Sequence, residues 1–261
     1  MRVHMNINGE SLMAMSVDER GNFVTAQAHL VRASNIADNQ LLAYQLGQVF
    51  STIAGDYSQT KLRAYNSGVD SYGGNPAEYQ RTLISAMTSQ LANRFIAREI
   101  PDRYPSPTNI YELFNARILA SSNRLSRTLS TYMGAMWERI ASISPYVLNP
   151  ENEFGLKITG IDIIITPPHD DSTYFAQLKS KCDTLTGSQS PRTIMELSIH
   201  PNPLFIAAFS LGGWTFNDRS GLIRRMAGKP FWDMIEIDYC TLQDCVQAML
   251  SDIETRLADR S

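Results

Sequence analysis

The chain has 261 residues, a formal net charge of −3 and a hydrophobic content of 43%. This length and composition suit one large globular domain, or one domain with a subdomain, and exclude a mini-protein. No apolar run reaches the roughly 18 to 20 residues that a membrane-spanning helix needs, and no secretory apolar segment follows the first residues. We therefore expect a protein without a membrane partner that stays in the compartment where it is made.

The cysteines and the basic residues add little that is specific. Cys182, Cys240 and Cys245 form no CxxC pair, so the sequence suggests neither a disulfide framework nor a zinc site. Of 23 basic residues, 18 are Arg, the side chain suited to bidentate pairing with phosphate or guanine. Codon bias is an alternative cause of this excess of Arg over Lys. A weakly acidic chain can still bind a polyanion, because the positive charge is needed only along one cleft.

The first half of the sequence predicts helices. Residues 24 to about 145 contain three long helical segments separated by turn residues. We expect the first segment over Val24–Ala54, ended by Gly55. The second starts with Asn75 as the N-cap and Pro76 at the first helical position. The third follows a Pro-Ser-Pro sequence, and Pro145 ends it.

From Leu156 onward the pattern changes to strands. Leu156–Thr166 is rich in β-branched residues, Pro167–Ser172 is a turn cluster, and Thr173–Lys181 has the pattern of a returning strand. We expect a buried strand, a short helix and a final amphipathic helix over Leu204–Leu211, Asp218–Ala227 and Thr241–Leu257. The order of elements predicts an α/β fold, with a mixed central β-sheet flanked by helices and a long helical N-terminal half.

One carboxylate, Asp162, interrupts an isoleucine-rich segment, where a charge is unfavourable unless a partner compensates it. A hairpin centred between His169 and Asp170 pairs residues whose numbers sum to about 339, which sets Asp162 opposite Gln177. Lys179, two residues further along, points to the same face of the sheet, while the neighbouring apolar residues point to the other. The sequence thus predicts a carboxylate, an amide and an ammonium group on one sheet face.

This combination suits the hydrolysis of a phosphodiester. That reaction needs oxygen ligands for Mg²⁺, a cation that stabilises the pentavalent phosphate, and a positioned water. Asp162 and the side-chain oxygen of Gln177, together with the backbone carbonyl of Leu178, are candidate Mg²⁺ ligands. Lys179 is the candidate for orienting the water and offsetting charge. The alternative is that Asp162 and Lys179 form an ordinary ion pair on the sheet face.

Gly160-Ile161-Asp162, followed fifteen residues later by Gln177-Leu178-Lys179, resembles the core of the PD-(D/E)XK nuclease superfamily. In that superfamily an aspartate on one strand and an acidic-x-Lys element on the next bind metal. Here Ile161 replaces the proline and Gln177 replaces the acidic residue, so the resemblance is to a variant form. It implies a restriction-endonuclease-like core, with Asp162, Gln177 and Lys179 as catalytic residues.

Flanking segments extend the resemblance over roughly residues 131 to 183. Gly134–Ile140 is similar to the family's pre-core helix, which brings a glutamate toward the metal. Glu138 is therefore a further catalytic and metal-ligand candidate, and a solvated helix-surface residue is the alternative. The polar segment after the core is similar to what restriction endonucleases place near DNA, although an ordinary solvated loop would have the same composition. Its candidate DNA contacts are Lys181, Asp183, Thr184, Ser188, Gln189 and Arg192.

The resemblance implies a type II restriction endonuclease that cuts both strands of a short duplex site with Mg²⁺. We then expect a homodimer in a prokaryotic cytoplasm, with a cognate DNA methyltransferase in the same host. Residues 1–130 would form a helical dimerisation or DNA-clamp region, and residues 131–261 the catalytic core. Two alternatives stay open. One is a catalytically weak or inactive DNA-binding protein on a nuclease-like fold, and the other is a helical structural protein in which Asp162 and Lys179 are merely paired.

Overall fold

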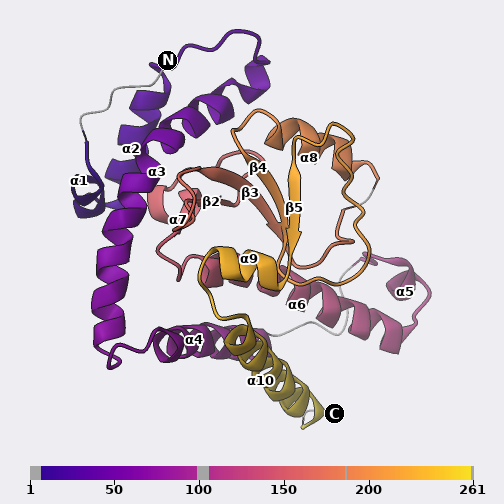
Figure 1. The fold of residues 1–261 in the computed structure, drawn as a ribbon. Helices are drawn as coiled ribbons and strands as arrows, with labels where there is room; N and C mark the ends of the chain where they lie inside the picture. The colour runs from indigo at the N-terminus through magenta and orange to yellow at the C-terminus, as the bar shows by residue number, and fades with distance from the viewer. Residues whose placement is uncertain (1–6, 99–105, 186, 260–261) are drawn as a thin grey trace.

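The computed structural model of the chain describes residues 7–98, 106–185 and 187–259. It has the predicted α/β architecture, in which a long helical first half precedes a five-stranded mixed sheet with flanking helices (Figure 1). The helices of the first half are α1 (Gly9–Ala14), α2 (Val17–Ala28), α3 (Asp38–Asp70), α4 (Pro76–Ala97), α5 (Ile110–Leu113) and α6 (Arg117–Ala141). Those of the second half are α7 (Pro150–Phe154), α8 (Gln189–Leu197), α9 (Lys229–Met234) and α10 (Tyr239–Ala258).

The first predicted helix, Val24–Ala54, is wrong at both ends. Its residues belong to two helices, α2 and α3, and the break between them contains Asn35 in a left-handed conformation (φ 68°). Gly55 does not end the helix, because Ile53 and Tyr57 on either side of it are buried and hold α3 in place. Tertiary packing here outweighs the weak helix propensity of one exposed glycine, which is about 1 kcal/mol less favourable than alanine.

The second predicted helix is confirmed, and the third is confirmed except at its start, because the short helix α5 and Asn115 in a left-handed conformation (φ 56°) precede Arg117, where it begins. The side chain of Asn75 accepts hydrogen bonds from the backbone N–H groups of Ala77 and Glu78, and Pro76 is the first residue of α4. The third helix is α6, whose inward face carries the buried Met136 and Ile140. An N-cap side chain replaces hydrogen bonds that the first turn of a helix lacks. These local signals therefore set where α4 begins.

The five strands are β1 (Val147–Leu148), β2 (Ile163–Ile165), β3 (Tyr174–Lys179), β4 (Pro203–Ala207) and β5 (Arg224–Ala227). They lie in the order β1-β2-β3-β4-β5, with the first two pairings antiparallel and the last two parallel. Ile163 pairs with Ala176 and Ile164 with Phe175, which confirms the predicted hairpin register. The backbone N–H of Asp162 donates to the Ala176 carbonyl at 2.9 Å and carries the pairing one residue further.

Two predicted elements differ from the structure. The strand predicted over Leu156–Thr166 is shortened to β2, because the chain turns at Gly160 (φ 80°) and Ile158 bridges to Ile161. The helix predicted over Asp218–Ala227 is wrong. The Asp218 carboxylate accepts hydrogen bonds from the N–H groups of Ser220 and Ile223 and so forms a turn, after which the chain joins the sheet as β5. Parallel pairing with β4, twenty residues earlier in the sequence, makes this segment a strand.

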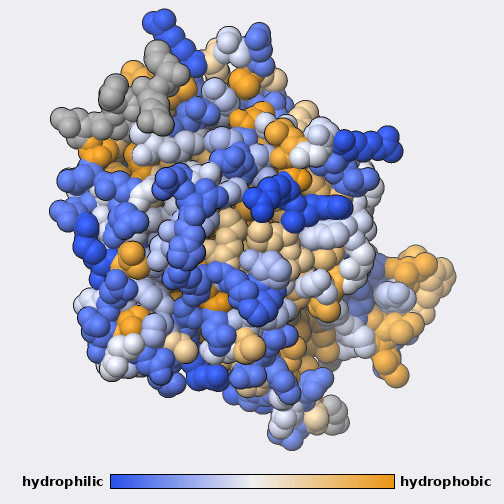
Figure 2. Space-filling view, viewed as in Figure 1, coloured by the Kyte–Doolittle hydropathy of each residue, from blue (hydrophilic) through white to orange (hydrophobic). Residues whose placement is uncertain are grey.

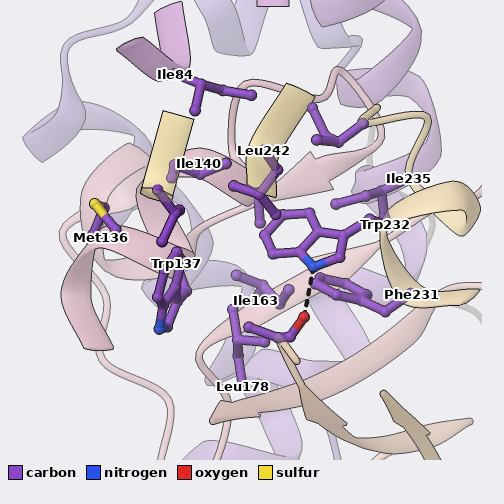
Figure 3. Close-up of a cluster of buried hydrophobic side chains, with 14 of the residues drawn as sticks. Ile84, Met136, Trp137, Ile140, Ile163, Leu178, Phe231, Trp232, Ile235 and Leu242 are labelled. Carbon is purple, nitrogen blue, oxygen red and sulfur yellow. Dashed lines mark hydrogen bonds between the residues drawn. The ribbon is translucent and has the colours of Figure 1, made fainter. Parts of the chain in front are cut away.

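Helices cover both faces of the sheet. The first hydrophobic cluster joins α4, α6, α9 and α10 to one sheet face, and it includes Trp137 and Trp232, whose Nε1 donates to the Ala208 carbonyl at 2.8 Å (Figure 3). The second cluster joins α1, α2 and α3 to the opposite face through Ile164, Phe175 and Phe205. The predicted division between residues 130 and 131 falls inside α6, and both clusters contain residues from either side of it. Within the described ranges, no helix is long and apolar enough to cross a membrane.

The buried ring of His200 generates a prediction about Gly47. A methyl group at Gly47 in α3 would lie 2.4 Å from Nδ1 of His200, which is 4% exposed and stacks on Phe175 at 5.0 Å. We expect Gly47→Ala to lower the free energy of unfolding by about 1 to 3 kcal/mol, because the ring must shift. Gly55→Ala on the same helix meets nothing within 4 Å and should raise it by about 0.5 to 1 kcal/mol. Urea unfolding measures both, and equal effects of the two substitutions would contradict this packing.

His200 also predicts a pH dependence of stability. Burial lowers the pKa of His200 to about 4, and neither ring nitrogen has a hydrogen-bond partner among the described residues. Between pH 6.5 and pH 4 the unfolded chain binds a proton at this position while the folded chain does not, so the free energy of unfolding falls as the pH falls. We expect this one group to remove about 3 kcal/mol across that window. His200→Phe should flatten this part of the pH profile of urea unfolding, and an unchanged slope would show that other groups cause it.

Candidate active site

An open cleft with a volume of about 710 Å³ lies where α6, α7, α8 and the β2–β3 hairpin meet. All four predicted catalytic side chains line it. Glu138 comes from α6, Asp162 directly precedes β2, and Gln177 and Lys179 belong to β3. Three elements that are separate in the sequence therefore place a carboxylate pair, an amide and an ammonium group in one cleft.

The alternation of side chains along the hairpin puts three of these groups together. Gln177 and Lys179 project to one face of β3, while Ala176 and Leu178 enter the first cluster on the other face, as predicted. Ile161 is an exception to the predicted pattern. It packs in the second cluster, because the turn at residue 160 rotates the chain before β2 begins.

Asp162 is tied to β3 by its side chain as well as its backbone. Its Oδ2 accepts a hydrogen bond of 2.7 Å from the backbone N–H of Leu178 and lies 3.8 Å from Nζ of Lys179. Burial raises the pKa of Asp162, while the positive charge of Lys179 and the Leu178 hydrogen bond oppose that change. The ion pair expected under the structural alternative is thus present.

Leu178 contributes its backbone to this arrangement. Its side chain is buried in the first cluster, and its N–H is bonded to Asp162. That its carbonyl serves as a metal ligand stays a prediction.

Glu138 is half-buried and faces the cleft rather than open solvent. Burial raises its pKa to about 7, and the negative charge of Asp162 adds to that effect. Nδ2 of the fully buried Asn149 donates to Oε2 of Glu138 at 3.4 Å and favours the ionised form. The two carboxylates are therefore close enough to repel each other, and a cation between them would relieve that repulsion.

The side-chain oxygen of Gln177 is the least satisfied atom in the cleft. Oε1 is buried and has no hydrogen-bond partner in the described part of the chain. An unpaired buried oxygen is unfavourable by about 1 to 3 kcal/mol, so an oxygen-seeking cation at this point would stabilise the structure. Glu138, Asp162 and Gln177 line the same cleft and carry side-chain oxygens, the type of ligand that Mg²⁺ prefers.

The carboxylates alone do not make a metal centre. In residues 7–98, 106–185 and 187–259, no group of three or more His, Cys, Asp or Glu side chains is arranged to hold a metal ion. Glu138 and Asp162 are two carboxylates, and the third oxygen-bearing side chain beside them, Gln177, is a neutral amide.

Three of the six predicted DNA-contact residues line the cleft, and the other three do not. Thr184, Gln189 and Arg192 line the cleft, whereas Lys181 and Asp183 form an exposed ion pair of 3.1 Å that does not. Ser188 also lies outside the cleft lining and precedes α8 as its N-cap residue.

The predicted loop is partly helical. Gln189 and Arg192 belong to the first turn of α8, so their description as loop residues is wrong. Nε of Arg192 donates to Oε1 of Glu196 one turn later at 2.7 Å, an i,i+4 pair that supports the helix. Thr186, which was part of the predicted loop, lies outside the described residues.

Sequence reasoning missed three charged residues of the cleft, Glu151, Lys157 and Glu196. A methyl group at Gly160 would lie 2.6 Å from Cβ of Glu196, so the absence of a side chain there lets α8 approach the hairpin. The glycine was therefore an available signal for close packing, but it did not identify the partner.

The comparison with known protein families finds no matching family model, and the comparison with curated proteins finds no similar sequence.

Gln177 allows a test of the metal site by stability alone. Gln177→Glu adds a third carboxylate beside Glu138 and Asp162, so without metal we expect the free energy of unfolding to fall by about 1 to 3 kcal/mol. Mg²⁺ should restore it, because the added charge becomes a ligand. Gln177→Met is the control, since it removes the unsatisfied oxygen and should respond little to Mg²⁺. Thermal unfolding in Mg²⁺ and in EDTA gives the readout, and a Gln177→Glu variant indifferent to metal would argue against a site here.

Proposed function

We propose that this protein is a Mg²⁺-dependent, sequence-specific endonuclease that hydrolyses phosphodiester bonds in double-stranded DNA, in the manner of a type II restriction enzyme. The observation that carries the proposal is the convergence of Glu138, Asp162, Gln177 and Lys179 on one open cleft. The confirmed hairpin register supports it, because that register sets the Asp162 carboxylate opposite the amide and next to the lysine.

The residues of the cleft have separate roles in this proposal. Glu138, Asp162 and Oε1 of Gln177 would hold the cation, which supplies Lewis-acid stabilisation of the charge on the phosphate. Lys179 carries a positive charge 3.8 Å from Asp162, where it can orient a water and offset charge in the transition state. The Leu178 N–H fixes the Asp162 carboxylate, so the ligand is positioned before substrate binds.

DNA recognition in this proposal comes from the α8 side of the cleft. Gln189 and Arg192 line the cleft and are of the types that hydrogen-bond base edges. Cutting both strands of a palindromic site is achieved most simply by a homodimer. We further propose that the protein acts in a prokaryotic cytoplasm and that a cognate DNA methyltransferase protects the host DNA.

A second candidate function is DNA binding with weak or absent catalysis. The observation in its favour is Gln177 itself, because a neutral amide is a weaker Mg²⁺ ligand than a carboxylate. Asp162 and Lys179 moreover pair with each other at 3.8 Å. Cleavage needs Asp162 and Lys179, whereas DNA binding does not. Substituting these two residues therefore distinguishes the two candidate functions.

The decisive experiment is plasmid cleavage in Mg²⁺ and in EDTA. We expect Asp162→Ala and Lys179→Ala to lower the cleavage rate roughly 100-fold or more, because each removes charge that acts on the reacting phosphate. Binding to the specific site in Ca²⁺ should change little, since neither residue reads bases.

The matched controls lie on α9. Lys229→Ala and Asp233→Ala remove an exposed ion pair of 2.6 Å outside the cleft and should cut normally. Wild-type protein that binds DNA but never cuts would favour the second candidate. Cleavage that survives in Asp162→Ala would contradict the assigned site.

A further inference from the structure

The α5–α6 hairpin carries a concentrated group of exposed apolar side chains. Six of the thirteen exposed large apolar side chains in the described part of the chain fall within ten residues of sequence. We call these six the apolar tip: Ile110, Tyr111, Leu113, Phe114, Ile118 and Leu119, which are between 39% and 83% exposed. Figure 1 shows α5 at the far end of α6, away from the sheet, and Figure 2 shows a projecting group of hydrophobic residues at this place.

The α5–α6 hairpin buries charged side chains between its helices and exposes its large apolar side chains. Between the two helices, Arg124 and Glu112 form an ion pair of 2.9 Å, with side chains only 9% and 6% exposed. The backbone N–H and the hydroxyl of Thr108 also donate to Glu112, at 2.7 and 2.9 Å. Polar contacts therefore fold the hairpin, while its large apolar side chains lie outside. A hairpin adapted to remain in water would have the opposite arrangement.

The area of the apolar tip fits a protein interface. If a fully exposed large apolar side chain presents about 200 Å², the tip presents roughly 700 Å². That exceeds the largest apolar patch of a typical monomer, which is about 300 to 600 Å². It approaches the roughly 800 Å² that each partner contributes to a standard interface. Two such tips pressed together would bury at most roughly 1,400 Å², which is near the lower end of the range of stable specific interfaces.

The border of the tip argues for protein rather than lipid or nucleic acid. The exposed residues beside it include Asn115, Ser121 and Ser122, which are polar and uncharged, and Arg117 is the one exposed cation between Ile110 and Ser122. A membrane-surface element or a DNA-binding surface needs clustered Lys and Arg, which a single arginine does not supply, whereas an apolar centre with a polar rim is typical of protein interfaces.

We infer that the apolar tip pairs with the same tip of a second copy of this chain, across a two-fold axis. A two-fold interface is self-complementary, so one surface suffices for both partners. The inference deepens the homodimer of the proposed function by naming its surface. Its basis in exposure and area does not depend on nuclease activity.

The test is the association state of the full-length protein without DNA or metal, measured by light scattering after size-exclusion chromatography. We expect wild-type protein to be a dimer. Phe114→Glu combined with Ile118→Glu should be a folded monomer, with association weakened at least roughly 100-fold, because these are the two most exposed side chains of the tip. Leu30→Glu, at a leucine outside the tip that is 66% exposed, should remain a dimer, and circular dichroism confirms that each variant is folded.

Other outcomes overturn the inference. A wild-type monomer, or a dimer that survives the double substitution, shows that the tip does not join two copies. A monomer that co-sediments with vesicles of phosphatidylcholine and phosphatidylglycerol through the tip would assign it to lipid instead. Plasmid cleavage is scored separately. A tip-dependent dimer without nuclease activity would leave this inference standing and remove the proposed function, and a cutting monomer would do the reverse.

Discussion

The pairing of β2 with β3 is the constraint on which both the core and the cleft depend. The backbone N–H of Asp162 donates to Ala176, and its carboxylate accepts from the N–H of Leu178, so one residue is fastened to the neighbouring strand at two points. A slip of one residue would turn Gln177 and Lys179 into the first cluster and Leu178 out into the cleft. Burial of the apolar side chains on both sheet faces therefore sets the register of β2 and β3. That register in turn fixes the position of the polar groups, which could not hold it by themselves.

The cleft collects groups that the folded chain leaves incompletely satisfied. The pKa of Glu138 is raised by burial and by Asp162, burial raises that of Asp162, and Oε1 of Gln177 has no partner among the described residues. Outside the cleft, the side chain of the buried Asn149 caps α7 and bonds Glu138, whereas the ring nitrogens of the buried His200 have no partner among the described residues. The cleft differs from the His200 site because it is open and brings several such groups together, which is typical of a functional site.

Local chemistry predicted much of this molecule, and long-range contacts account for the rest. The turn residues between β2 and β3 were enough to give the register and three members of the cleft, and Asn75 with Pro76 gave the start of α4. The continuation of α3 past Gly55 depends on burial of its neighbours against other helices, and β5 depends on a strand twenty residues earlier. The approach of Glu196 to Gly160 brings together residues from two separate elements. No window of sequence contains these contacts, so periodicity and turn chemistry could not reveal them.

The N-terminal helices are used mainly for the core, which limits where partners can bind. α1, α2 and α3 cover one face of the sheet and α4 helps to cover the other, so most of their apolar surface is already buried. α6 is different, because it carries part of the apolar tip at one end and Glu138 near the other. The twenty residues from Ile118 to Glu138 span about 30 Å of straight helix. If two tips pair, the angle at which the two α6 helices cross would then set the distance between the two clefts, and hence the spacing of any two bonds that a dimer could reach together.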